Sequence, residues 1–210
     1  MKQLLLNIPA FAGATLLLVM VPGKGVAMVL KQSIMGGSKA ALLSAAGNCA
    51  GIFIWSISSA IGLSAIFTRS EIAYSLLKWT GVVFLVLVSL QTAFTLRKEF
   101  GNLDLNGKKQ GSNWASFRLG LITNLTNVKA AVYAVAFLPA FVPRDFSLAW
   151  GIFIFGSIWA IVSFSWNLLL IWTVKKSSAY IQKPTVRRTL TAISALGIMG
   201  LALGLAFSGR

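Results

Sequence analysis

Long, unbroken runs of apolar residues are the feature that most restricts how this chain can fold. Residues 81–90 (GVVFLVLVSL) are apolar on every side, whereas the strands of a membrane barrel alternate between apolar and polar residues. A helix needs about 20 mostly apolar residues to cross the hydrocarbon layer of a bilayer. Six runs fit this requirement, at approximately residues 4–30, 40–67, 72–96, 119–142, 146–174 and 190–207. We therefore predict an all-α, polytopic membrane protein with six transmembrane helices, which together form a single domain over residues 1–210.

The composition supports the same class. Of the 210 residues, 57% are hydrophobic and 11% are charged, whereas a soluble domain is roughly 25% charged. A core of this size could not bury all the apolar runs, so lipid is the expected surrounding. The single cysteine, Cys49, excludes an internal disulfide and a cysteine-based metal site.

The excess of basic residues indicates how the helices are oriented. The chain has 19 Lys plus Arg, 4 Asp plus Glu and a net charge of +15. Such a charge would suggest nucleic-acid binding in a soluble protein, but basic residues of a membrane protein collect in its cytoplasmic connections. The connections after the first, third and fifth runs hold 12 of the 19, whereas the other side holds Lys2, Arg69, Arg144 and Arg210. We therefore expect both termini outside and no nucleic-acid partner.

The N-terminal run has a second interpretation. Lys2 followed by apolar residues resembles the start of a cleaved secretory signal peptide. We favour a membrane span, because the run is long, no clear small-x-small cleavage site follows it, and its removal would leave five spans.

The longest connection, residues 97–118 (RKEFGNLDLNGKKQGSNWASFR), lies at the middle of the chain. Its glycine, asparagine and lysine residues predict a flexible cytoplasmic linker. It divides the chain into three spans and three spans. Because each half has an odd number of spans, two related halves would have opposite orientations in the membrane, which is a 3+3 inverted repeat.

Two of the predicted spans contain residues that interrupt a membrane helix. The first span contains VPGKG at residues 21–25, and the fourth contains TNLTNVK at residues 123–129. Proline removes a backbone donor, glycine loosens a helix, and a break at membrane depth usually lines a cavity. Each break lies about 12 Å from one end of its run, at 1.5 Å per residue. Paired interruptions in corresponding spans indicate the binding site of a transporter.

We predict a substrate site formed by residues of both breaks: Pro22, Gly23, Lys24, Asn124, Asn127 and Lys129. Exposed backbone amides and the two lysines would bind a carboxylate, while asparagine oxygens and freed carbonyls would bind an ammonium group. Two structural alternatives stay open. Lys24 could reach the membrane surface from a simple kink, and a deep lysine could be tied to backbone carbonyls. A third lysine of the spans, Lys78, is better explained as interfacial.

The positions of the acidic residues restrict the chemistry. All four acids, Glu71, Glu99, Asp104 and Asp145, lie in predicted connections, and the chain has no histidine. An intramembrane metal site or a carboxylate-based catalytic centre therefore lacks its usual ligands. We expect neither an enzyme nor a cofactor. Three lysines within the spans also disfavour cation export.

Small residues predict two close helix contacts. Gly47-x-x-x-Gly51 in the second span and Gly200-x-x-x-Gly204 in the sixth have the spacing that lets two helix backbones approach each other. Polar residues near the first pair, such as Ser44 and Asn48, are candidates to face a cavity.

The residues of both breaks and their surroundings resemble the LysE/RhtB family of bacterial amino-acid exporters, which are small six-span proteins of the inner membrane. The resemblance rests on the Pro-Gly break, on LKWTG at residues 77–81, and on FRLGLITNLTNVKAA at 117–131 followed by FLP at 137–139. It implies efflux of amino acids such as lysine, homoserine or threonine without a bound cofactor.

The chain also departs from that family at three places. The family usually has Thr-Pro-Gly-Pro where this chain has VPGK at residues 21–24, and Asn-Pro-Lys where it has NVK at 127–129. Many members carry an acid three residues before a tryptophan in the fifth span, where this chain has Ser163 before Trp166.

Our leading hypothesis is export of an amino acid or a closely related small metabolite by alternating access. The partners are then a small-molecule substrate and the lipid bilayer, and a homodimer would be usual for so small a transporter. The alternative is a diverged, non-transporting scaffold or accessory subunit that keeps the fold.

Overall fold

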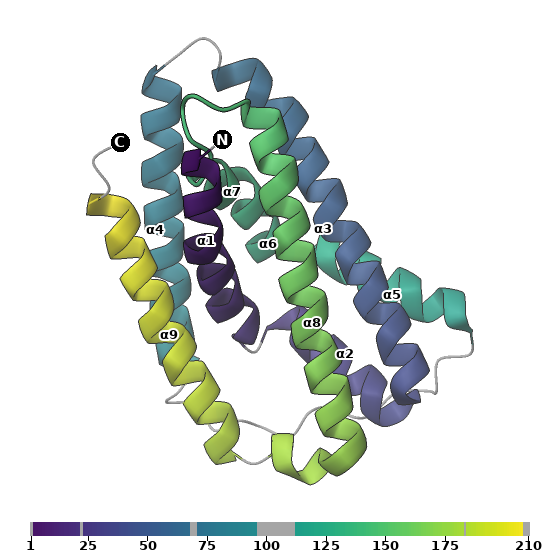
Figure 1. Cartoon of the computed structure of the whole chain (residues 1–210). Helices are drawn as coiled ribbons and strands as arrows, with labels where there is room; N and C mark the ends of the chain where they lie inside the picture. Colours follow the sequence, from purple (N-terminus) through teal and green to yellow (C-terminus); the bar gives the residue numbers. More distant parts are fainter. Residues whose placement is uncertain (1, 22, 68–70, 96–111, 183, 208–210) are drawn as a thin grey trace.

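The computed structural model describes residues 2–21, 23–67, 71–95, 112–182 and 184–207, and these residues are almost entirely helical, with no strand among them. In chain order the elements are α1 (Lys2–Met20), α2 (Lys24–Met35), α3 (Gly37–Phe67), α4 (Glu71–Thr95), α5 (Asn113–Leu125), α6 (Val128–Val132), the π-helical turn η1 (Tyr133–Phe137), α7 (Leu138–Ala140), α8 (Leu148–Gln182) and α9 (Pro184–Phe207) (Figure 1). The predicted all-α class is confirmed.

Several helices are long and apolar enough to cross a membrane. Within the described ranges these are α1, Gly37–Gly62 of α3 and Leu148–Lys176 of α8. The pair Asn113–Leu125 and Val128–Ala140 adds a fourth span if the two pieces, bent by 59° at their break, cross together. The apolar parts of α4 and α9 are shorter. The polytopic membrane class is therefore confirmed, whereas the count of six spans and the inverted repeat stay predictions.

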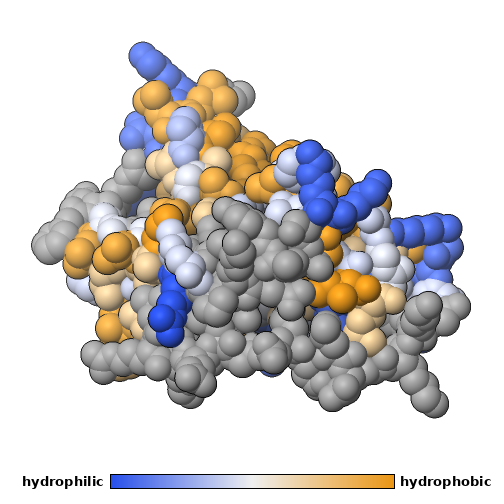
Figure 2. All heavy atoms as spheres, turned by 90° about the horizontal axis from the view of Figure 1, so that it is seen from below, coloured by the Kyte–Doolittle hydropathy of each residue, from blue (hydrophilic) through white to orange (hydrophobic). Residues whose placement is uncertain are grey.

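Exposed apolar side chains cover the sides of the bundle. Ile61, Val128 and Leu196 are 71%, 72% and 76% exposed. Seen from the end of the bundle near α2, apolar side chains reach the surface and hydrophilic ones project at its edge (Figure 2). Large contiguous apolar surfaces are rare on soluble monomers, so this distribution fits a chain surrounded by lipid.

The predicted start of the fourth span shifts because of local capping. Helix α5 begins at Asn113 rather than at Leu119, because the Ser112 hydroxyl accepts a hydrogen bond from the Ala115 amide at 3.1 Å. The last residues of the predicted linker are therefore helical, while residues 97–111 lie outside the described ranges.

Helices α8 and α9 are both longer than the predicted spans. α8 continues beyond residue 174 to Gln182, and α9 begins at Pro184 rather than at residue 190. Proline suits the first turn of a helix because its fixed φ is already helical and its missing amide would have no helical acceptor there.

Helix α1 occupies the middle of the bundle (Figure 1). It contacts α8 and α9, while α3 packs against α5 and α8, and α4 packs against α9. The first described residue of α1 and the last of α9 lie toward the same end of the molecule, as expected for an even number of spans. This arrangement brings the break after α1 near the break between α5 and α6.

An aromatic cluster fixes α1 to the second interrupted element. Phe11 of α1 is fully buried, and its ring centroid lies 6.3, 5.9, 5.2 and 4.7 Å from those of Tyr133, Phe137, Phe141 and Phe155. Aromatic pairs at such separations contribute about 0.5–1.5 kcal/mol each beyond their buried area. The cluster therefore holds α1, η1 and α8 in one arrangement beside the two breaks.

Glycines allow α3 and α5 to cross with their backbones in contact. A Cβ atom at Gly47 would overlap the Phe117 carbonyl, and one at Gly120 would overlap the Ser44 carbonyl. The Ser44 hydroxyl also donates to the Ser116 carbonyl at 2.9 Å. The close contact predicted for Gly47 and its neighbours is confirmed.

The second predicted glycine contact is wrong for the part of the chain that the structure describes. A Cβ atom at Gly200 or Gly204 would meet nothing within 4 Å. Both glycines are exposed on α9, because Gly197 is the residue that faces the bundle and packs against Leu17.

Candidate functional site

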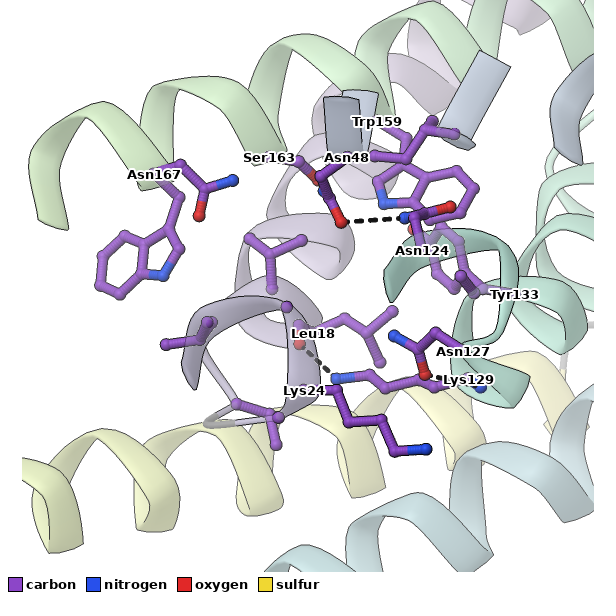
Figure 3. A pocket seen from close by; sticks show the side chains of 18 residues that line it. Leu18, Lys24, Asn48, Asn124, Asn127, Lys129, Tyr133, Trp159, Ser163 and Asn167 are labelled. Carbon is purple, nitrogen blue, oxygen red and sulfur yellow. Dashed lines mark hydrogen bonds between the residues drawn. The ribbon is translucent and has the colours of Figure 1, made fainter. Parts of the chain in front are cut away.

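A cavity of about 120 Å³ lies where the two interrupted elements meet (Figure 3). Its wall includes five of the six predicted site residues, namely Gly23, Lys24, Asn124, Asn127 and Lys129. The sixth, Pro22, lies outside the described residues. The two breaks, which lie about a hundred residues apart in the sequence, therefore contribute to one cavity.

The first break leaves helix α2 without a side-chain cap. Gly23 is the N-cap residue in an extended conformation, with φ −132° and ψ −173°, and its carbonyl accepts the first helical hydrogen bond from Ala27 at 2.9 Å. The amides of the residues between them have no acceptor within the helix. Since Gly23, Lys24 and Gly25 line the cavity, this positively polarised helix end faces it.

The second break is stabilised by the polar residues that the sequence places there. The Asn127 side chain caps α6 by accepting from the Lys129 amide at 3.2 Å. The Thr126 hydroxyl donates to the Ile122 carbonyl at 2.7 Å, and the Asn127 amide donates to the Asn124 carbonyl at 3.0 Å. Asparagine is a preferred N-cap residue, so the sequence ends α5 and restarts α6 at a bend.

Lys129 joins the two breaks directly. Its ammonium Nζ donates to the Leu18 carbonyl at 2.8 Å, near the end of α1 (Figure 3). The alternative that a deep lysine is tied to a backbone carbonyl is therefore confirmed for Lys129. An ammonium has three donors and this contact uses one, so the same group, which lines the cavity, can also bind an anion.

Lys24 brings a second positive charge to the cavity. Its side chain is exposed and also lines the wall, so the charge lies where the cavity meets the surface. None of the 18 lining residues is Asp or Glu. The described part of the wall is therefore positive without a compensating acid.

Asn124 connects α5 to α3 behind the cavity. It is 3% exposed, its Nδ2 donates to Asn48 Oδ1 at 3.1 Å (Figure 3), and its carbonyl accepts from Trp55 Nε1 at 3.4 Å. Its side chain lies against Gly51, where a Cβ atom would overlap it. Asn124 is therefore a cross-link between helices as well as part of the wall.

One face of α8 completes the cavity. It carries Ser163, Trp166 and Asn167, which are three and four residues apart and therefore lie on the same side of a helix. Trp159 and Tyr133 also line the wall. Our sequence reasoning did not predict Tyr133, Trp159, Trp166 or Asn167 as site residues. For the residues of α8, the sequence signal that could have identified them is the helical spacing of polar and aromatic residues within an apolar span.

A comparison with protein families identifies the family of this chain. The model of the LysE type translocator family matches residues 16–209. The chain belongs to this family. The predicted resemblance is therefore confirmed, and the chain is a multi-pass membrane translocator from a family of transporters rather than enzymes.

Individual relatives agree with this assignment. The homoserine/homoserine lactone efflux proteins of Salmonella typhi and Salmonella typhimurium are 32% identical over 142 residues, which is 67% of this chain and 67% of each relative. An uncharacterised membrane protein of Bacillus subtilis, YrhP, is 23% identical over 97% of this chain and 98% of its own length. No solved structure matches the chain.

Proposed function

We propose that this LysE-family protein exports an amino acid or a closely related small metabolite by alternating access. The observation that carries the proposal is the cavity at the junction of the two helix breaks, which has Lys24 and Lys129 in its wall and no acid among its described lining residues. Broken membrane helices that meet at a polar cavity are the usual architecture of transporter substrate sites.

The donors of the cavity suit a carboxylate. The Lys129 ammonium, the Lys24 ammonium and the free amides at the start of α2 all favour negative charge. Asn48 and Asn127 line the same cavity, and their side-chain oxygens suit the ammonium group of an amino acid. A volume of about 120 Å³ is well below the 300 Å³ or more of a drug-sized pocket, which favours a small solute.

The relatives support the direction and the class of solute. The two Salmonella proteins are named for efflux of homoserine and homoserine lactone. Homoserine has a carboxylate, an ammonium group and a hydroxyl, so it matches the groups in the wall. We propose a location in a bacterial inner membrane with both termini outside, and we propose that the protein is a homodimer.

The helix breaks provide the movable joints for alternating access. The helical hydrogen bonds are broken at two places. One is the bend of 59° between α5 and α6, and the other is the break between α1 and α2. Rotation at these two places would open the cavity to one side of the membrane and close it to the other. The contact between Lys129 and Leu18 spans both joints and would change during the cycle.

A transport measurement with purified protein tests the proposal. Proteoliposomes preloaded with unlabelled homoserine are expected to take up labelled homoserine by exchange, whereas protein-free liposomes take up none. A panel of other amino acids and hydroxy acids is measured in the same way. Absence of exchange for every solute in the panel would contradict export and favour the non-transporting scaffold.

A further inference from the structure

The wall contributed by α8 differs chemically from the wall contributed by the helix breaks. Ser163 and Asn167 are 4% and 6% exposed, and both line the cavity together with Trp166. The indole Nε1 of Trp166 is buried and has no hydrogen-bond partner among the described residues. A buried donor without an acceptor is unfavourable unless a ligand supplies the acceptor.

The two positive groups lie on the other part of the wall. Lys24 belongs to the first break and Lys129 to the second. A solute whose carboxylate binds to these lysines would direct its side chain toward α8. There it meets a hydroxyl, a carboxamide and an indole N–H, and no carboxylate among the described lining residues.

We propose that this face of α8, formed by Ser163, Trp166 and Asn167, is the side-chain subsite that determines substrate selectivity. It accepts carboxylic acids whose side chain is uncharged and carries a hydrogen-bond acceptor, such as a hydroxyl or a carbonyl. It rejects solutes with a cationic side chain, because a second positive charge would be desolvated beside two lysines without a counter-charge. This selectivity rests on the proposed export function.

The first test compares solutes in the wild-type protein. In proteoliposomes that exchange labelled homoserine, unlabelled homoserine and glutamine are expected to compete at least ten times more strongly than lysine and ornithine. Equal competition by lysine would overturn the selectivity, while the exchange itself would uphold the export function. If no solute is exchanged, the export function fails and the selectivity fails with it.

The second test changes the charge of the subsite. Asn167→Asp keeps the size of the side chain and adds a negative charge. Ser163→Asp adds the charge one helical turn away, on a slightly larger side chain. Each variant is expected to raise the competition by lysine relative to homoserine at least tenfold. Ser147→Asp, which adds the same charge at an exposed serine outside the cavity wall, is the control and keeps the wild-type ratio. If both acid variants purify as folded protein and keep the wild-type ratio, the proposed subsite is wrong.

The third test removes only the unpartnered donor. Trp166→Phe keeps an aromatic ring and loses the indole N–H, so competition by homoserine is expected to weaken about fivefold or more. Competition by norvaline, which has no acceptor in its side chain, is expected to stay unchanged. An equal loss for both solutes would indicate a packing role for Trp166 and would overturn its part in the selectivity.

Discussion

A single lysine connects the two halves of the chain. Lys129 belongs to the second break, yet its ammonium is held 2.8 Å from the Leu18 carbonyl near the end of the first. The last carbonyl groups of a helix receive no hydrogen bond from an amide of the same helix, so they need other donors. Lys129 therefore stabilises the end of α1 and also presents a positive charge to the cavity.

We expect Lys129→Met to reduce homoserine exchange at least tenfold, because the variant loses both the tether and a charge in the site. Hydrogen bonds to charged groups contribute about 1.5–3 kcal/mol, and each 1.4 kcal/mol corresponds to about a tenfold change. Lys39→Met is the matched control, since Lys39 is exposed on α3 and is not part of the wall. Unchanged exchange by Lys129→Met would show that the lysine has no role in transport.

A second residue-scale contact joins α1 to the π-helical turn. The hydroxyls of Thr15 and Tyr133 lie 2.6 Å apart, and both side chains are fully buried. Because the Thr15 hydroxyl donates to the Phe11 carbonyl at 2.7 Å, the Tyr133 hydroxyl is the donor between them.

A double-mutant cycle with Thr15→Val and Tyr133→Phe measures this contact. We expect a coupling free energy of about 0.6 kcal/mol and at most about 1.7 kcal/mol, the average and the maximum of such cycles between membrane helices. The measurement is the free energy of unfolding in mixed micelles. Thr80→Val replaces Thr15→Val in the control cycle, because the exposed Thr80 hydroxyl bonds only within its own helix. Additive effects of Thr15→Val and Tyr133→Phe would contradict the coupling.

At the scale of the elements, we predict opposite changes in stability for alanine substitutions in the two glycine pairs. Gly47→Ala is expected to destabilise the protein by about 1–3 kcal/mol, because the new Cβ overlaps the backbone of α5. Gly200→Ala is the control and is expected to be neutral or stabilising, because its Cβ meets open space and alanine favours a helix. Thermal unfolding in detergent checks both. A similar loss for Gly200→Ala would indicate an additional contact of α9 that this chain alone does not show.

The breaks were predictable because their causes are local. Proline, glycine and an N-capping asparagine act on the backbone within a few residues, so the sequence alone located the interruptions at residues 21–25 and 123–129. The bend angle and the π-helical turn η1 depend on packing against α1 and α3, which no local pattern contains. For the same reason the face of α8 that completes the cavity was missed, since its residues are remote from both breaks.

At the scale of the whole molecule, the orientation in the membrane can be measured. We expect Ser112→Cys to be cytoplasmic and Ser147→Cys to be outside, both in a Cys49→Ser background. Both serines are exposed. An impermeant maleimide should then label Ser147→Cys in intact cells and label Ser112→Cys only after permeabilisation. The reverse pattern would place both termini inside.

The membrane class and the family were accessible from the sequence because they depend on summed properties. The length of the apolar runs and the motif at residues 117–131 do not require a known packing. The packing partners of individual glycines can be identified only when the packing is known. For this reason the spacing at Gly200 and Gly204 predicted a contact that α9 does not make within this chain.

The backbone contact between α3 and α5 leaves no side chain between the two helices at Gly47 and Gly120. Sliding either helix by one residue would replace a glycine with a larger residue at the crossing, so the pair has a single register. We therefore expect the pair to stay rigid while the neighbouring helices move in the proposed transport cycle. A covalent cross-link between α3 and α5 should therefore leave the transport cycle running, whereas one between α1 and α6 should arrest it.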